Sequence, residues 1–338
     1  RWEAGRALAK EVMAEMALKG TPVRSDWLDA LAAVTFDETL DPAFRALALR
    51  LPSEDDMAAT LHDAGIVPDP DRIWRERRRM ARALAQHLAP RLPALVAGMV
   101  EPGPFSPDAR AAGRRALRLA ALGLLALVDG GAAATAAHGA ADNMTESVGT
   151  LAILLDIGQG AAELQRFEAR WHGDANVMDK WFSLQAMLAA PDQAAEVTAR
   201  LTAHPAFDWK NPNRFRSVIG ALSANHAGFH HADGSGYRLV ADWLMRLDPL
   251  NPQTAARMST AFETWPRYDA DHRFIGYIGD LLYAPELDYM QAPDVDIHVA
   301  LQSSNLIAQL QAALAGAGLC VLPDFIAARG EIFTGIVF

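Results

Sequence analysis

The stretch LDPAFRALALRLPSEDDMAATLHDAG, residues 40–65, carries two helix start signals and one stop signal. Asp41 can accept hydrogen bonds from the first N–H groups of a helix, and Pro42 suits the first helical position because the N–H that it lacks would be unpaired there. Ser53 and Asp56 have the spacing of a capping box, and the glycine that closes the stretch can end a helix. The stretch therefore predicts two helices in succession.

The same pattern of caps, apolar periodicity and short polar turns runs along most of the chain. Further helices are predicted at 105–131, 161–172, 178–190, 193–203, 212–224 and 237–247. Many helices joined by short turns favour a mainly α fold, an α-helical superhelix or solenoid of stacked helix pairs. Because no fixed repeat period is visible, this prediction rests on the density of helices alone.

Composition limits the classes of partner. The chain has 338 residues, of which 51% are hydrophobic and 21% charged, enough for a sizeable buried core. Its formal net charge of −10 opposes attraction to nucleic acid or to anionic membranes, so neither is predicted as a partner. The basic run RERRRMAR at 75–82 is interpreted as a solvated helix face. The apolar run LAALGLLALV at 119–128 is far shorter than the roughly 20 residues of a membrane span and predicts a buried helix.

Two features bear on the compartment and on the completeness of the chain. Cys320 is the single cysteine, so it cannot form an internal disulfide, and a reducing cytoplasm is the simplest expected location. The chain opens RWEAG, with neither an initiator methionine nor the pattern of a signal peptide. We therefore expect the chain to be a piece of a longer polypeptide.

After residue 272 the pattern changes from helical to mixed. HRFIGYI at 272–278 and VDIHVAL at 295–301 predict strands, SSNLIAQLQAALAGAG at 303–318 predicts a helix, and LCVLPDFI at 319–326 predicts a third strand. Strand, helix and strand in succession form a βαβ unit with a parallel sheet. We therefore predict a helical domain at 1–271 followed by a small α/β, Rossmann-like fragment at 272–338.

The segment FHHADGSGY at 229–237 is the most suggestive local cluster of polar residues. His230, His231 and Asp233 could be metal ligands, and the two glycines could form a phosphate loop. Adjacent histidines point in different directions on most backbones, however, and the glycine spacing is not that of a P-loop. The segment is therefore interpreted as a turn that leads into a helix. None of the ten histidines is followed by glutamate, so the chain has no H-E-x-x-H zinc motif.

Seven ordered segments of residues 1–270 resemble the C-terminal helical domain of bacterial aminopeptidase N. They are RWEAG at 1–5, LDPAFRALALRLPSE at 40–54, ADNMTES at 141–147, VMDKWFSLQA at 177–186, HPAFDWKNPNRFRSVIGA at 204–221, FHHADGSGYR at 229–238 and LNPQTAARM at 250–258. In that family a preceding catalytic domain holds zinc and removes N-terminal residues from peptides, while the helical domain caps the active-site cavity. The resemblance implies a non-catalytic chain with no cofactor of its own, whose partners are the catalytic domain, in the same polypeptide, and peptides.

Three arginines in these segments allow two interpretations. Arg214, Arg216 and Arg257 lie among apolar residues, where an unpaired charge would be costly, so each must pair or face water. One interpretation is a salt bridge between helices. The other, implied by the resemblance, is that Arg216 and Arg257 face the cavity and hold the carboxylate end of a bound peptide. Asn211 and Asn213 are interpreted as caps of the helix that presents them.

The tail resembles a different family. The segments at 272–289 and 301–331 are similar to the second lobe of the effector-binding domain of LysR-type transcription regulators. The resemblance implies that Ser303, Ser304 and Asn305, at the start of a helix, could meet an anionic effector. The first lobe and the DNA-binding reader of that family are absent from this sequence.

Together these similarities predict a junction of two unrelated families near Asp269–His272. Two other functions remain open beside the peptidase interpretation. The helical part could be a solenoid that binds other proteins through a concave surface. The tail could retain some sensing of a small ligand.

Overall fold

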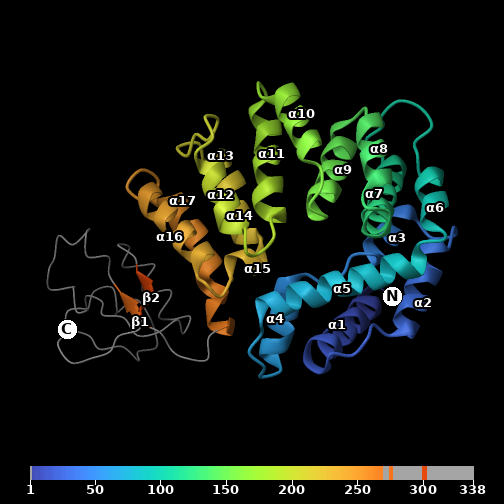
Figure 1. Cartoon of the computed structure of the whole chain (residues 1–338), viewed down its shortest axis with the longest axis horizontal. Coiled ribbons are helices and arrows are strands. Elements are labelled where there is room, and N and C mark those ends of the chain that lie inside the picture. The colour runs from blue at the N-terminus through green and yellow to red at the C-terminus, as the bar shows by residue number, and fades with distance from the viewer. Residues whose placement is uncertain (1, 269–273, 277–298, 303–338) are drawn as a thin grey trace.

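The computed structural model describes residues 2–268, 274–276 and 299–302, and helices dominate this part of the chain (Figure 1). The helices are α1 (Trp2–Lys19), α2 (Ser25–Phe36), α3 (Pro42–Ala48), α4 (Glu54–Asp63), α5 (Pro70–Leu88), α6 (Leu92–Gly98), α7 (Ala109–Asp129), α8 (Ala132–Ala140), α9 (Met144–Asp156), α10 (Ala161–Trp171), α11 (Ala175–Leu188), α12 (Ala194–Thr202), α13 (Pro212–Phe215), the π-helical turn η1 (Arg216–Gly220), α14 (Ala221–Ala224), α15 (His226–Phe229), α16 (Ser235–Leu247), α17 (Pro252–Ser259) and the 3₁₀ segment η2 (Thr260–Tyr268). The prediction of a mainly α chain is confirmed.

The predicted helix starts at 40–65 are found as expected. The Asp41 carboxylate accepts a hydrogen bond from the backbone N–H of Ala43 at 2.7 Å, and α3 begins at Pro42. Ser53 and Asp56 form the capping box at the start of α4. Helix α7 begins later than its sequence suggests, because Asp108 and not Ser106 accepts the hydrogen bond from Ala111 N.

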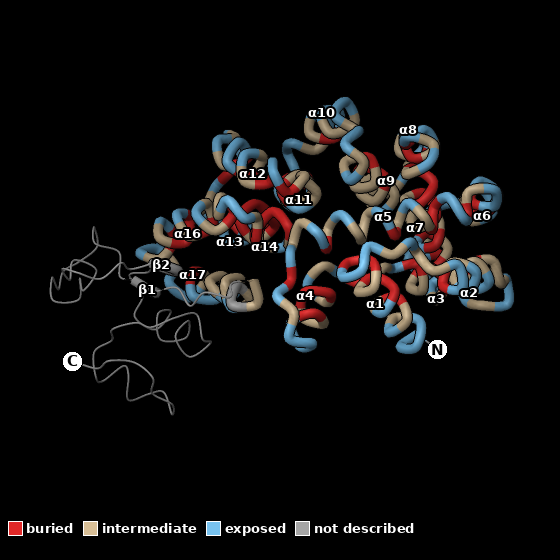
Figure 2. Tube along the Cα trace, turned by 60° about the horizontal axis from the view of Figure 1, so that its bottom comes forward, coloured by how far each residue is buried: buried red, intermediate tan, exposed pale blue. Residues whose placement is uncertain are grey.

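The helices pack side by side in chain order into a curved superhelix (Figures 1 and 2). Two large apolar clusters form the core, one built mainly from α1 to α7 and the other from α9 to α17. A smaller cluster of Ala126, Ala134 and Leu154 joins α7, α8 and α9 between them. Each helix therefore buries its apolar face against its neighbours, as in a solenoid.

The first and last parts of the superhelix also touch each other. Helices α4 and α5 contact α15, and α4 contacts η2. Arg267 Nη1 lies 2.8 Å from Asp55 Oδ1, and the backbone N–H of Ala227 donates to Glu54 Oε2 at 3.3 Å. These contacts join the first and last described parts of the helical region.

Two short strands follow the helical region. Strand β1 (Phe274–Gly276) pairs in parallel with β2 (Val299–Gln302), at the places where the sequence predicts the first two strands. The predicted helix at 303–318, the third strand at 319–326 and the junction at 269–272 lie outside the described residues. The small α/β unit therefore stays a prediction.

The apolar run at 119–128 lies within α7. Leu122 and Ala121 are fully buried in this helix, as predicted. Among the described residues, none of the helices combines the length and the apolar character that crossing a membrane requires.

The turn before α16 yields a test of the fold. A Cβ atom on Gly236 would lie 2.5 Å from the carbonyl oxygen of Gly228 and 2.6 Å from that of Phe229, so Gly236→Ala must push backbone apart. We expect a loss of about 1–3 kcal/mol in the free energy of unfolding, measured by urea denaturation.

Gly139→Ala is the matched control. Gly139 lies in α8, and a Cβ atom there would meet nothing within 4 Å. Since alanine is the better helix former, this variant should gain about 0.5–1 kcal/mol. Equal effects of the two substitutions would contradict the close packing at Gly236.

Candidate functional site

A pocket of about 680 Å³ lies where α9, α11, α13 and η1 meet. Its lining residues are Val148, Asn176, Asp179, Lys180, Ser183, Leu184, Asn213, Arg216 and Ser217. One of the two arginines that the sequence offers for substrate binding, Arg216, is therefore placed at a pocket.

The segment NPNRFRS builds one wall of this pocket through its local structure. Asn211 caps α13, since its side-chain oxygen accepts hydrogen bonds from Asn213 N at 3.0 Å and from Arg214 N at 3.4 Å. Pro212 occupies the first helical turn. At Arg216 the helix widens into the π-helical turn η1 before it continues as α14. Such π turns are often found at functional sites, because they change which side chains share a face.

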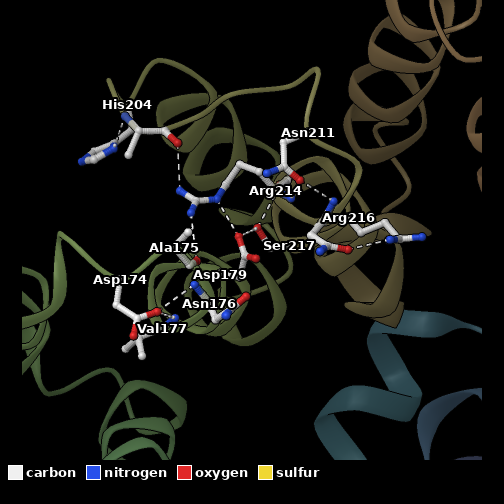
Figure 3. A network of polar contacts seen from close by, with 12 residues as sticks. Asp174, Ala175, Asn176, Val177, Asp179, His204, Asn211, Arg214, Arg216 and Ser217 are labelled. Atoms are coloured by element: carbon white, nitrogen blue, oxygen red, sulfur yellow. Dashed lines mark hydrogen bonds and ion pairs between the residues drawn. The ribbon is translucent and has the colours of Figure 1, made fainter.

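The Arg214 side chain is buried and forms hydrogen bonds within the protein. Its guanidinium donates through Nε to Asp179 Oδ1 at 2.6 Å, through Nη1 to the Ala206 carbonyl at 2.8 Å and through Nη2 to the Ala175 carbonyl at 3.0 Å (Figure 3). It also lies over the ring of Phe182, at 4.7 Å from the centroid. For Arg214 the salt-bridge interpretation is confirmed.

Arg216 has a different environment. Figure 3 shows its side chain directed away from Arg214, and its Nη2 donates to the side-chain oxygen of Asn213 at 2.7 Å. Among the described residues, no carboxylate lies within ion-pair distance of Arg216. The expectation that Asn213 caps the helix is wrong: Asn211 is the cap, and the Asn213 side chain instead lines the pocket and holds the Arg216 guanidinium.

The charges at the pocket suit an anionic group. Arg216 and the exposed Lys180 are cationic, while the one acidic residue of the lining, Asp179, is already paired with Arg214. A guanidinium held in a defined orientation can form forked hydrogen bonds with a carboxylate. The described lining therefore combines an oriented guanidinium with a second cation, Lys180.

The other predicted binding residues are placed elsewhere. Arg257 lies on α17, is exposed, and is not among the residues that line this pocket. Its neighbour Met258 does approach the pocket wall, since a Cβ atom on Gly220 would lie 3.4 Å from Met258 Cε and 3.6 Å from Arg216 Cβ. Ser303, Ser304 and Asn305 lie outside the described residues. A binding role for these four residues stays a prediction.

The segment 229–237 forms a turn that leads into α16, as predicted. His231 Nδ1 lies 3.0 Å from Asp233 Oδ1, and Asp233 accepts a hydrogen bond from Ser235 N at 2.7 Å, so these polar groups stabilise the turn. Within the part of the chain that the structure describes, no group of three or more His, Cys, Asp or Glu side chains could hold a metal ion.

Sequence reasoning missed a buried polar network at the contact between the two ends of the superhelix. His226 Nε2 hydrogen-bonds Tyr268 Oη at 2.7 Å, and His230 Nδ1 hydrogen-bonds Tyr237 Oη at 2.6 Å. His226 Nδ1 also lies 3.7 Å from Glu54 Oε2. These residues come from separate segments, so no local sequence motif predicts the network.

Burial controls the protonation of this network. It lowers the pKa of His226 to about 4 and that of His230 to about 3, because a charged imidazole is poorly solvated there. It raises the pKa of the Glu54 carboxyl and of the Tyr268 hydroxyl for the same reason. Both histidines are therefore neutral at neutral pH.

Comparison with known protein families assigns the chain to a class of helical repeat domains. The family described as "Domain of unknown function (DUF3458_C) ARM repeats" matches residues 1–274, and the chain belongs to this family. The sequence is 37% identical over 293 residues to aminopeptidase N of Caulobacter vibrioides, covering 84% of this chain and 33% of that protein. It is 36% identical over 248 residues to aminopeptidase N of Escherichia coli, covering 72% of this chain and 28% of that protein.

A solved structure agrees with this assignment. The crystal structure of Legionella pneumophila aminopeptidase A in complex with aspartic acid superposes with a TM-score of 0.71 and 27% identity, covering 80% of this chain and 33% of that chain. The chain spans about a third or less of the length of the relatives that it matches. Residues 1–274 therefore correspond to the C-terminal helical domain of aminopeptidase N.

The Arg214–Asp179 pair predicts a large local effect on stability. Asp179→Asn removes the charge opposite a guanidinium whose side chain is only 8% exposed. We expect the free energy of unfolding to fall by about 2–4 kcal/mol, somewhat below the usual cost of breaking a buried pair because Asp179 is partly exposed. Glu196→Gln is the control, because Glu196 pairs with Arg200 at the surface and should matter by less than about 0.5 kcal/mol. Similar losses in both variants would contradict a structural role for Arg214.

The buried histidines predict a loss of stability in acid. Their pKa values in the folded state lie below the ordinary value of 6.5, so the unfolded state binds more protons as the pH falls from about 6.5 to about 4. In this window each histidine should lower the free energy of unfolding by up to about 1.4 kcal/mol per pH unit. Urea denaturation at a series of pH values measures the slope.

His226→Gln and His230→Gln should each reduce the slope of unfolding free energy against pH by up to about 1.4 kcal/mol per pH unit, the value for one proton. His62→Gln, at an exposed position of α4, is the control and should leave the slope unchanged. Glu54 opposes the histidines, since its raised pKa makes the folded state bind a proton more readily, so the comparison between variants is decisive. If neither variant alters the slope, the lowered pKa values of His226 and His230 are not the cause of the acid sensitivity.

Proposed function

We propose that residues 1–274 act as the non-catalytic C-terminal domain of a zinc aminopeptidase and form part of the wall of its peptide-binding cavity. The observation that carries the proposal is Arg216, a guanidinium held at the edge of a pocket by Asn213 with no ion-pair partner among the described residues. The identity to aminopeptidase N in two organisms supports the choice of this activity class.

The pocket supplies recognition and not the hydrolytic step. In the proposed enzyme, residues of the catalytic domain would hold a zinc ion, which would supply Lewis-acid chemistry for the hydrolysis. This sequence has no H-E-x-x-H motif. Arg216 and Lys180 present N–H donors that can bind a peptide's terminal carboxylate, and Asn213 limits the rotation of the guanidinium. Binding the far end of the peptide would orient its amino end toward the catalytic domain.

The proposed partner is an aminopeptidase catalytic domain, in the same polypeptide as this domain. Peptides are the proposed substrates, and the cytoplasm is the proposed location because of the lone Cys320. Arg257 is a second proposed contact with peptide, from α17.

The tail supports only a weaker, separate proposal. The parallel pairing of β1 with β2 agrees with a LysR-type effector lobe at 272–338, in which Ser303, Ser304 and Asn305 would meet an anionic effector. Sequencing the source DNA across residues 269–272 tests whether the two families are joined in the genome. Two separate reading frames would overturn the fusion.

Reconstitution with a separately expressed catalytic portion of aminopeptidase N tests the peptidase proposal. We expect the chain alone to hydrolyse no aminoacyl amide, and the mixture to form a complex and cleave peptides. Arg216→Ala should raise KM about tenfold or more for peptides with a free terminal carboxylate, because a charge-assisted hydrogen bond is worth about 1.5–3 kcal/mol. KM for aminoacyl amides, which lack the carboxylate, should not change.

Arg200→Ala is the matched control, since Arg200 is exposed on α12 and pairs with Glu196. Equal effects of Arg216→Ala on both kinds of substrate would exclude carboxylate binding. Failure of the chain to associate with the catalytic portion would instead favour a solenoid that binds other proteins.

A further inference from the structure

Helix α7 carries four arginines within the nine residues 110–118. Arg110 is exposed to solvent. Arg114 Nε lies 2.7 Å from Glu101 Oε1, and Arg118 is paired with Glu146 on α9. Arg115 differs from these three because it is buried, at 5% exposure, and no carboxylate of the described residues lies within ion-pair distance of it.

The Arg115 guanidinium stacks against an aromatic ring. Its central carbon lies 4.5 Å from the ring centroid of Phe105, which stacks on it from the loop between α6 and α7. Stacking uses the face of the guanidinium, whereas its N–H groups donate in the plane. Nε and Nη1 are buried and have no hydrogen-bond partner in the described part of the chain.

Arg118, close to Arg115, is a second arginine with a buried donor that lacks a described partner. It follows Arg115 by three residues on α7, so the two side chains share one face of the helix. Its Nη1 binds Glu146, but its Nε is also buried without a partner among the described residues. The two guanidinium groups therefore have three buried nitrogen donors without a described partner, and only Arg118 is paired with a carboxylate.

The other nearby carboxylate is committed elsewhere. Asp108 caps α7 by accepting from Ala111 N at 2.9 Å, and it also accepts from the Ser106 hydroxyl. A guanidinium keeps its charge when buried, and an uncompensated buried charge is strongly destabilising. Asp108 interacts electrostatically with Arg115 from beyond ion-pair distance, so what Arg115 lacks among the described residues is hydrogen-bond acceptors for its buried N–H donors.

We propose that this face of α7 binds a small oxyanion, a phosphate or a carboxylate, at the Arg115 guanidinium. One such anion would accept hydrogen bonds from the unpaired N–H groups. Phe105 covers the site from an exposed loop, since its own side chain is 49% exposed, and this ring is the element that must shift for exchange. The site shares no residue with the pocket at Arg216, and the proposal does not depend on the peptidase function.

Calorimetric titration of the full chain with inorganic phosphate tests the proposal, in buffer of constant ionic strength set with chloride. We expect saturable binding of one phosphate per chain and a melting temperature that rises with phosphate concentration. Acetate in a parallel titration distinguishes a carboxylate site from a phosphate site. Saturable binding of either anion supports the proposal, and binding of neither overturns it.

Variants locate the binding. Arg115→Met should abolish it, and Arg110→Met, on the exposed side of the same helix, should leave it unchanged. If Arg115→Met does not fold, Arg115→Gln keeps polar donors without the charge and should weaken binding more than tenfold. Undiminished anion binding in a folded Arg115 variant would overturn the proposal. It would also be overturned if neither anion raised the melting temperature of the wild type while Arg115→Met melted at a higher temperature.

Discussion

The buried guanidinium of Arg214 organises the region on which the candidate site depends. It connects α11 through Asp179 and the Ala175 carbonyl with the loop after α12 through the Ala206 carbonyl. Ser217 supports the same arrangement by donating to the Arg214 carbonyl at 2.8 Å. Since Arg214 also stacks on Phe182 in the second core cluster, the start of α13 is fixed both by polar bonds and by packing. The pocket is thus lined by elements that this one side chain holds together.

That arrangement explains why two arginines only two residues apart have different roles. In a regular helix such residues point in different directions, and here the change to a π turn occurs at Arg216 itself. Arg214 enters the interior, where its charge is compensated, while Arg216 remains at the pocket with an amide as its described partner. A cation paired with a neutral group keeps more of its capacity to bind an incoming anion than one already paired with a carboxylate.

The sequence was most informative where structure depends on neighbouring residues. The caps at Asp41 and Ser53 and the turn at 229–237 follow from side chains that bond their own backbone, so they can be predicted locally. The roles of Arg214 and Arg216 could not be separated in this way, because the partner of Arg214 lies on a different helix. The misassigned cap at Asn213 shows the same limit. Two asparagines flank Pro212, and only the structure shows that Asn211 takes the cap while Asn213 turns to Arg216.

The network around His226 was equally invisible to local reasoning, because it joins segments that lie far apart in the sequence. Tyr268 packs against the first core cluster and hydrogen-bonds His226, while Arg267 pairs with Asp55 on α4. Segment η2 is therefore anchored to α4. A repeat array normally gains stability only from adjacent units, whereas contacts between its two ends add a long-range constraint. Because this constraint is supplied by Arg267 and Tyr268, the superhelix closes with residues that lie inside the family match at 1–274. The pocket at Arg216 and the buried Arg115 both lie on helices within this closed unit.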